Sequence, residues 1–73
     1  MEYAVLIDRD TDTGAVAATS PDFENVIYVG DPAESDAEVC KKFGESLSFY
    51  LDYLRSEGKP VPPPHHRVAT VTV

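Results

Sequence analysis

Three aspartates near the N-terminus have the spacing of possible cation ligands. Asp8, Asp10 and Asp12 alternate along the chain and Gly14 follows them, as in the first half of a calcium-binding loop. An EF-hand loop needs glycine at its sixth position and a bidentate glutamate at its twelfth. Counted from Asp8, Gly14 is the seventh residue and Thr19 the twelfth, so the pattern fails at both positions. We therefore interpret the segment as a hairpin turn, in which Asp side chains accept bonds from nearby backbone N–H groups.

The other candidates for chemistry are two histidines and one cysteine. His65 and His66 are adjacent, so in an extended segment they point to opposite faces and cannot chelate one ion together. We interpret them as polar residues ahead of an edge strand, because no nucleophile accompanies them. Cys40, the single cysteine, falls in an apolar helical pattern and is predicted to lie in the core.

An RNase H-type nuclease is disfavoured, because its metal-binding carboxylates would have to converge from separate elements. We expect no catalytic residue, no metal site, no cofactor and no enzymatic activity.

The charge of the chain limits the kinds of molecule that it can bind. Thirteen Asp and Glu residues against six Lys and Arg give the 73 residues a formal net charge of −7. Binding of a nucleic-acid backbone or of an anionic membrane needs clustered cations, so we expect neither. An acidic surface suits a basic protein, since complementary charge speeds encounter and rejects wrong partners. The one cysteine excludes an intrachain disulfide and favours a cytoplasmic location.

Strand-type residues recur in three short runs before the middle of the chain. Turn residues separate these runs, which predicts an antiparallel meander with short connections. The three predicted strands are Tyr3–Asp8, Ala15–Ser20 and Asn25–Gly30.

A single long helix is predicted to follow, from Pro32 to about Glu57. Asp31 is a suitable N-cap, and Ser35 with Glu38 offers a second possible start one turn later. Apolar residues then recur every three or four positions, as on the buried face of a helix.

The chain closes with residues that alternate Val, Ala and Thr, which predicts a last strand at Val68–Val73. A right-handed crossover through the helix would lay it beside the first strand and parallel to it, with the first strand in a central position. The predicted fold is thus one α/β domain over residues 1–73, of the two-layer α+β type. Its order is β-β-β-α-β: a three-stranded antiparallel meander, one long helix on one face, and a C-terminal strand parallel to the first.

Two features predict an interface. The first and third strands are apolar on both sides, including Tyr3 and Tyr28, yet one helix can cover only one sheet face. Phe49 and Tyr53, an i, i+4 pair, lie away from the helix's predicted core stripe and are typical interface anchors. We predict that these four residues contact a partner or a second copy of the chain. The alternative for the helix pair is that the Pro62–Pro64 connector folds over it.

The assembled pattern resembles the HicB-like antitoxins over nearly the whole chain. The N-terminal part of the likeness is Tyr3-x-Val5-x-Ile7-Asp8-x-Asp10, Gly14, Val16-Ala17 and Pro21-Asp22. The C-terminal part is Gly30-Asp31, Tyr50-Leu51 and Gly58-Lys59-Pro60 followed by further prolines. Phe23–Val26 departs from the Pro-Gly-Cys-like residues of many members.

The resemblance implies a partial RNase H-like fold without catalytic carboxylates. It also implies a partner, a small basic HicA-type toxin that cleaves mRNA, which the antitoxin neutralises by covering its active site. Members commonly form homodimers or higher homo-oligomers. Because this sequence stops at Val73, we expect a stand-alone domain without the C-terminal DNA-binding domain of many members. The alternative is a homo-oligomeric domain with no toxin partner.

Overall fold

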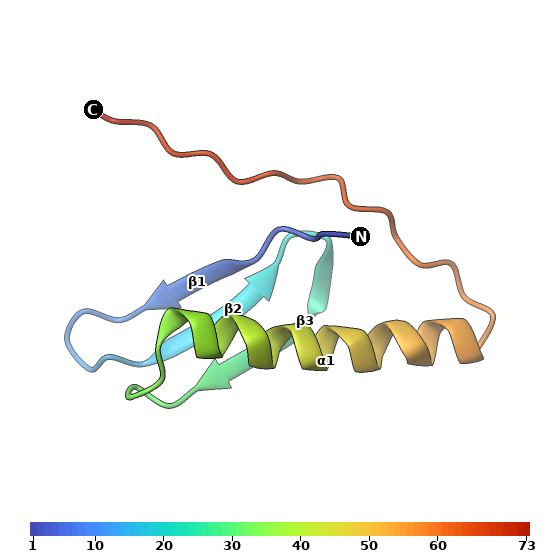
Figure 1. Ribbon diagram of the computed structural model, residues 1–73, viewed down its shortest axis with the longest axis horizontal. Helices are drawn as coiled ribbons and strands as arrows, with labels where there is room; N and C mark the ends of the chain where they lie inside the picture. The colour runs from blue at the N-terminus through green and yellow to red at the C-terminus, as the bar shows by residue number, and fades with distance from the viewer.

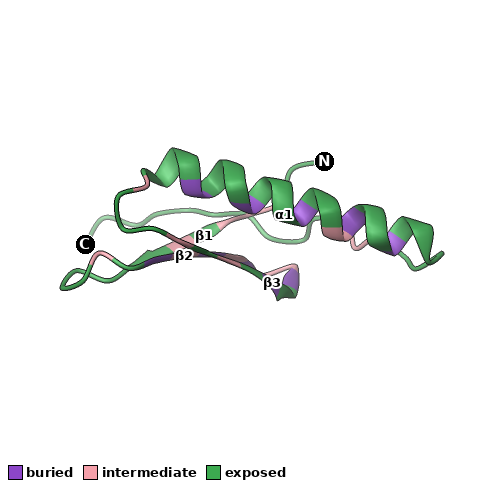
Figure 2. Cartoon of the chain, turned by 90° about the horizontal axis from the view of Figure 1, so that it is seen from below, coloured by how far each residue is buried: buried purple, intermediate pink, exposed green.

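Three strands and one helix make up the regular structure of this protein. The computed structural model describes residues 1–73. Its elements are β1 (Leu6–Arg9), β2 (Val16–Ser20), β3 (Phe23–Gly30) and α1 (Asp36–Ser56). The strands form one antiparallel sheet in the order β1-β2-β3, and α1 lies across one of its faces (Figures 1 and 2). The predicted α+β class, the meander and the single helix layer are confirmed.

The hairpin between β1 and β2 is held by the aspartates that first suggested a cation loop. Asp10 Oδ1 accepts the backbone N–H of Asp12 at 2.7 Å and that of Thr13 at 3.1 Å. These two bonds lower the pKa of Asp10, because they favour the charged carboxylate. Gly14 has a φ of +76°, a backbone conformation that glycine adopts without strain. The prediction of a hairpin turn is confirmed.

β1 is shorter than predicted and lies at an edge of the sheet. The first strand begins at Leu6 rather than Tyr3, and its only strand neighbour is β2. The predicted strand Val68–Val73 is not formed in this structure, so β1 does not take the expected central position. Three consecutive prolines at 62–64 precede this segment and have no N–H to donate to a strand.

The helix uses the later of its two possible starts. Ser35 is the N-cap, and its Oγ accepts the backbone N–H of Glu38 at 3.2 Å. Asp31, the cap favoured from the sequence, instead opens a separate turn. The Asp31 N–H donates to Glu34 Oε1 at 2.6 Å, and the Glu34 N–H donates to the Asp31 carbonyl at 2.9 Å. One of the two bonds of a capping box thus forms in the loop ahead of α1, while the Asp31 side chain accepts the Ala33 N–H at 2.8 Å.

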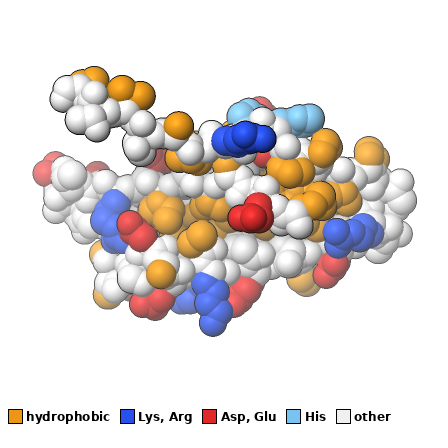
Figure 3. All heavy atoms as spheres, turned by 45° about the horizontal axis from the view of Figure 1, so that its top comes forward, with side chains coloured by type: hydrophobic (Ala, Val, Ile, Leu, Met, Phe, Trp, Pro, Cys, Tyr) orange, Lys and Arg blue, Asp and Glu red, His pale blue; other side chains and the backbone are white.

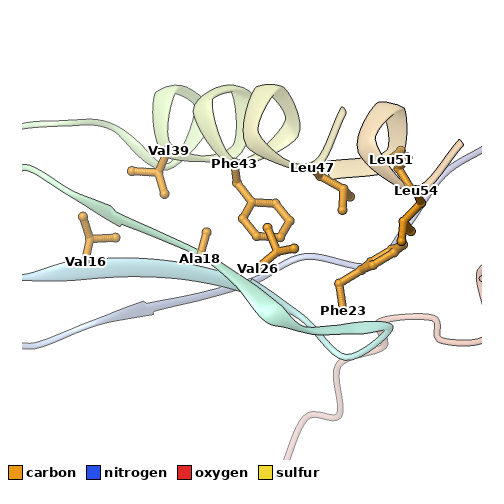
Figure 4. Close-up of a cluster of buried hydrophobic side chains, with 9 residues drawn as sticks. All are labelled: Val16, Ala18, Phe23, Val26, Val39, Phe43, Leu47, Leu51 and Leu54. Carbon is orange, nitrogen blue, oxygen red and sulfur yellow. The ribbon is translucent and has the colours of Figure 1, made fainter. Parts of the chain in front are cut away.

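The core lies between the helix and the inner face of the sheet (Figure 4). Strands β2 and β3 supply alternate side chains, and α1 supplies a row whose members are three or four residues apart. The nine buried apolar residues are Val16, Ala18, Phe23, Val26, Val39, Phe43, Leu47, Leu51 and Leu54.

Cys40 is exposed, so its predicted place in the core is wrong. The buried row on α1 runs through Val39, Phe43, Leu47 and Leu51 in steps of four residues. Each such step turns about 40° around the helix axis, because four residues exceed one turn of 3.6. By the first turn of the helix the face toward the sheet has therefore rotated to Val39, and Cys40 lies beside it.

α1 is longer than the sheet beneath it. Its 21 residues span about 32 Å, whereas the eight residues of β3 span about 27 Å. The C-terminal end of the helix extends past the strands (Figure 1). The C-terminal tail (residues 59–73) turns back there, and Val61 packs against the core.

Candidate functional site

The face of the sheet opposite α1 is uncovered. Strand register aligns Leu6, Thr19 and Ile27 in one row and Asp8, Ala17 and Val29 in the next. We call these six residues the outer sheet face. Val29 is 71% exposed, Ile27 60% and Leu6 45%, although all three are large and apolar. The predicted uncovered apolar sheet face is confirmed.

A shallow hollow of about 420 Å³ lies at the hairpin end of the outer sheet face. It is lined by four apolar residues, by two aspartates and by one cation, Arg9; these residues are Asp8, Arg9, Asp10, Ala15, Val16, Ala17 and Val29. Apolar walls with charged groups at one end are suited to a long side chain that has an aliphatic stem and a charged head.

The only cation in the sheet-forming half is directed away from the outer sheet face. Residues 1–30 contain six Asp or Glu residues and a single cation, Arg9. The Arg9 guanidinium donates to the carbonyl of Pro32 at 3.2 Å, to that of Glu34 at 2.9 Å and to Asp36 Oδ1 at 2.9 Å. It thereby fastens β1 to the loop and first turn of α1, on the inner side of the sheet. Sequence reasoning missed this role, because these partners lie 23 to 27 residues away.

A second exposed apolar surface lies on the helix. Phe49 is 79% exposed and Tyr53 45%, and we call them the helix aromatic pair. Tyr53 stacks on Tyr50 with ring centroids 6.2 Å apart, and Lys59 Nζ lies 5.4 Å from the centroid of the Tyr53 ring. The tail leaves Phe49 uncovered, so the alternative in which the Pro62–Pro64 connector covers the pair is wrong for Phe49.

Tyr3 and Tyr28 lie on the inner side of the sheet and their hydroxyls are engaged within the chain. The Tyr3 hydroxyl donates to the carbonyl of Pro62 at 2.6 Å, and its ring meets Phe23 edge-on at 4.8 Å. The Tyr28 hydroxyl donates to Glu34 Oε1 at 2.8 Å. The structure therefore brings the helix aromatic pair together but keeps both tyrosines apart from it. An interface role for the four residues stays a prediction.

Glu34 joins β3, the loop and α1. Its carboxylate pairs with Lys42 Nζ at 2.7 Å and also accepts bonds from the Asp31 N–H and the Tyr28 hydroxyl. The bonds from Lys42, the Asp31 backbone and Tyr28 lower the pKa of Glu34 to about 2. Burial, together with the bond to the Glu34 carboxylate, raises the pKa of Tyr28. This network fixes the start of the helix over the sheet.

Asp22 holds the tail against the far end of the sheet. Its side chain is only 2% exposed, and Oδ1 lies 2.8 Å from His66 Nδ1 and accepts the His65 N–H at 3.3 Å. Burial raises the pKa of Asp22, but the bonds from His66 and His65 outweigh it and the net shift is downward. Oδ2 is buried without a partner. No local pattern predicts this contact, because 43 and 44 residues separate the partners.

A groove of about 300 Å³ separates the N-terminal segment from the flank of α1. Tyr3 and Val5 line one wall, and Phe43, Gly44 and Leu47 belong to the other. A Cβ added at Gly44 would meet no atom within 4 Å, so this flank of the helix faces open space. Apolar side chains gather between the helix and the tail on this side of the molecule (Figure 3).

Nowhere in the chain do three or more His, Cys, Asp or Glu side chains come close enough to share an ion. No helix of the chain is both long and apolar enough to cross a bilayer. The chain matches no protein-family model, no curated protein and no solved structure. Its function is therefore inferred from the surfaces described above.

Proposed function

We propose that this protein is a non-enzymatic, HicB-like antitoxin module. It neutralises a small basic HicA-type toxin, an mRNA-cleaving protein, by covering the toxin's active site. The observation that carries the proposal is an acidic domain, with a net charge of −7, that leaves large apolar side chains exposed on two sides. The order of motifs along the chain supports the family, and the single cysteine supports a cytoplasmic location.

The physical basis of neutralisation is charge steering followed by apolar contact. An RNA-cleaving toxin must carry cations to hold the phosphate backbone. An acidic protein competes for those cations and is drawn to them at long range. Exposed apolar side chains then exclude water at the centre of the contact, which slows dissociation.

Co-expression with the product of the adjacent reading frame tests this proposal. We expect a short basic protein there that co-purifies with this chain and is toxic to cells when expressed alone. Failure to co-purify, or failure to protect the cells, would contradict an antitoxin role.

The helix aromatic pair favours a second candidate, a homo-oligomeric domain with no toxin partner. Phe49 is 79% exposed and adjacent to Tyr53 on the helix surface, as expected of a homotypic contact. In this case light scattering at micromolar concentration gives a mass above the 8.0 kDa of one chain. The variant Phe49→Asp lowers that mass without unfolding the chain, whereas Lys41→Asp, at an exposed helix position two turns away, does not. A strict monomer would exclude this candidate.

The proposed RNase H-like architecture also includes a fourth strand, formed by Val68–Val73 along the free edge of β1. Three observations support it. Asp22 and Tyr3 fasten the tail at the level where β1 begins. From there the tail runs in the direction of β1, on its open side (Figure 1). The groove beside α1 is open where such a strand would close it.

The alternation of the tail specifies the register of this strand. Ala69, Val71 and Val73 share one side and would face the groove, whereas Val68, Thr70 and Thr72 would extend the outer sheet face. Slow exchange of every second amide over these residues is the expected result, since an edge strand pairs alternate N–H groups with its one neighbour, β1. The variant Val71→Asp should abolish that protection and Thr70→Asp should preserve it. Equal and rapid exchange of all these amides in the unsubstituted protein contradicts the fourth strand.

A further inference from the structure

We infer that the outer sheet face, rather than the helix aromatic pair, is the surface that binds a basic protein partner. The contact has an apolar centre of Leu6, Ile27 and Val29, and the carboxylates of Asp8 and Asp10 lie at its edge. This inference rests on the proposed function, because it names the surface and the partner chemistry by which that function is performed.

The apolar centre is the first observation. Leu6, Ile27 and Val29 are between 45% and 71% exposed, and they come from the two edge strands. Ala17 and Thr19 of β2 lie between them in the strand register, so the small side chains form the floor and the large ones the sides. Two edge strands that expose large apolar side chains around a low middle form a surface that a strand or helix of a partner can enter.

The second observation is the charge of this face, which requires a partner of positive charge. Asp8 lies within the outer sheet face, and its side chain forms no hydrogen bond or ion pair within the chain. Asp10 accepts only backbone N–H groups, so its negative charge is not neutralised by a cation. Arg9 is engaged by Pro32, Glu34 and Asp36 on the inner side. The outer sheet face therefore presents uncompensated carboxylates beside apolar side chains.

The rest of the chain differs in its charge balance. Residues 31–73 contain seven Asp or Glu residues and five Lys or Arg residues. Lys59 lies over the Tyr53 ring, and Arg55 pairs with Asp52 one turn away at 3.3 Å. A basic partner would meet Lys59 at the helix aromatic pair, whereas Arg9, the one cation that borders the hollow on the sheet, is held by Pro32, Glu34 and Asp36. Like charges brought together at an interface oppose binding. This favours the outer sheet face over the helix aromatic pair as the surface that binds a basic partner.

The partner segment is thus basic and amphipathic. Its apolar side chains contact Ile27 and Leu6, and a Lys or Arg stem lies along Ala17 and Val29 in the hollow with its charge at Asp8. A second acidic copy of this chain fits poorly, because it would bring Asp8 against equivalent carboxylates.

Nuclear magnetic resonance with ¹⁵N-labelled protein tests the inference without a natural partner. The probe is a short peptide of alternating lysine and valine, titrated at low salt. We expect shifts at the amides of Leu6, Asp8, Ala17, Ile27 and Val29 that saturate and that weaken as salt is raised. Shifts confined to α1, or no shifts, overturn the inference. Concentration-dependent shifts on this face without peptide also overturn it, since they identify a second copy as the occupant.

A matched pair of variants makes the test specific. Asp8→Lys reverses one charge on the outer sheet face, and Glu45→Lys makes the same change on the exposed side of α1. We expect Asp8→Lys to weaken peptide binding about tenfold, equivalent to ~1.4 kcal/mol, and Glu45→Lys to change it less than about twofold. Equal effects show non-specific attraction and overturn the inference. Asp8→Asn, which removes the charge without reversing it, should give an intermediate loss.

The same variants separate this inference from the proposed function. If the adjacent-frame protein binds and is released by Glu45→Lys rather than by Asp8→Lys, the antitoxin role stands and the surface is wrong. If the peptide binds the outer sheet face while the adjacent-frame protein does not bind at all, the surface stands and the antitoxin role is wrong.

Discussion

At the scale of single residues, two carboxylates join parts of the chain that are distant in sequence. Asp22 connects the β2–β3 turn to the tail, and Glu34 connects β3 to the helix through Tyr28 and Lys42. The pKa values of both carboxyls are lowered, so each favours the folded state most when it is ionised. Their contribution must therefore decline in acid.

Removal of the Asp22 carboxylate should free the tail. In Asp22→Ala the N–H of His65 and the ring of His66 lose their acceptor, so we expect the His65 amide to exchange at least about tenfold faster. Asp12→Ala, a loss of an exposed carboxylate in the hairpin, is the control and should leave that exchange unchanged. An unchanged rate in Asp22→Ala would show that Tyr3 and Val61 alone hold the tail.

Acid should weaken the Glu34 network within a defined pH window. The ordinary pKa of this carboxyl is 4.5 and the folded-state value is about 2. The stabilisation is thus fully present above pH 4.5 and is lost as the pH falls toward 2. Urea unfolding at a series of pH values should show this loss, and in Glu34→Gln that part of the pH dependence should be absent. An identical slope in the variant and the unsubstituted protein contradicts the network.

At the scale of the elements, the helix has one buried face and one exposed aromatic pair. Phe43 is completely buried between α1 and the sheet, whereas Phe49, six residues later, is 79% exposed. Phe43 therefore packs in the core, whereas Phe49 is available for contact with another molecule.

Truncation of these two phenylalanines should separate the roles. Phe43→Ala should lower the free energy of unfolding by about 3–5 kcal/mol, because it leaves a cavity in the core. Phe49→Ala should change it by less than ~0.5 kcal/mol. Urea denaturation measures both, and a large loss for Phe49→Ala would mean that its ring is buried in solution.

Gly44 offers a stabilising change on the same helix. It lies in the interior of α1 with open space around an added Cβ. Gly44→Ala should therefore raise the free energy of unfolding by about 0.5–1 kcal/mol, since alanine restricts the unfolded chain and favours helix. Gly14→Ala is the matched contrast and should destabilise, because Gly14 has a φ of +76° and its added Cβ would lie 3.3 Å from Pro32. Stabilisation by both changes would contradict these backbone assignments.

Local sequence patterns predicted the strands and the helix that form. They predicted less well where each element ends and which element lies beside it. Alternation in the third run placed Val26 and Tyr28 on one side and Ile27 on the other, as the structure has them. The helix start was ambiguous, because Asp31 and Ser35 both form capping bonds and only the path of the chain decides between them. The burial of Val39 instead of Cys40 follows from the angle at which α1 crosses the sheet, which no helical periodicity specifies.

At the scale of the whole molecule, the domain has more apolar surface than one helix can cover. The outer sheet face, the helix aromatic pair and the free edge of β1 are all open in the single chain. The prediction of an uncovered sheet face came from strands that are apolar on both sides. No local sequence pattern predicted the contacts that hold the tail, because Asp22 and Tyr3 are close to the tail only in the folded chain.

Ionic strength should govern the association of the whole molecule with a basic partner. A chain of net charge −7 loses long-range attraction as salt is added, whereas apolar contact at the outer sheet face persists. We expect the association rate to fall steeply between low and physiological salt and the dissociation rate to change little. Stopped-flow mixing measures both, and an association rate that is independent of salt contradicts the role given to charge.

The most direct test of the proposed antitoxin function is an mRNA-cleavage assay. The product of the adjacent reading frame is incubated with mRNA, with and without an equimolar amount of this chain. Cleavage should stop as the complex forms, and Asp8→Lys should restore it where Glu45→Lys does not. Cleavage that continues unchanged in the presence of this protein would contradict neutralisation by occlusion.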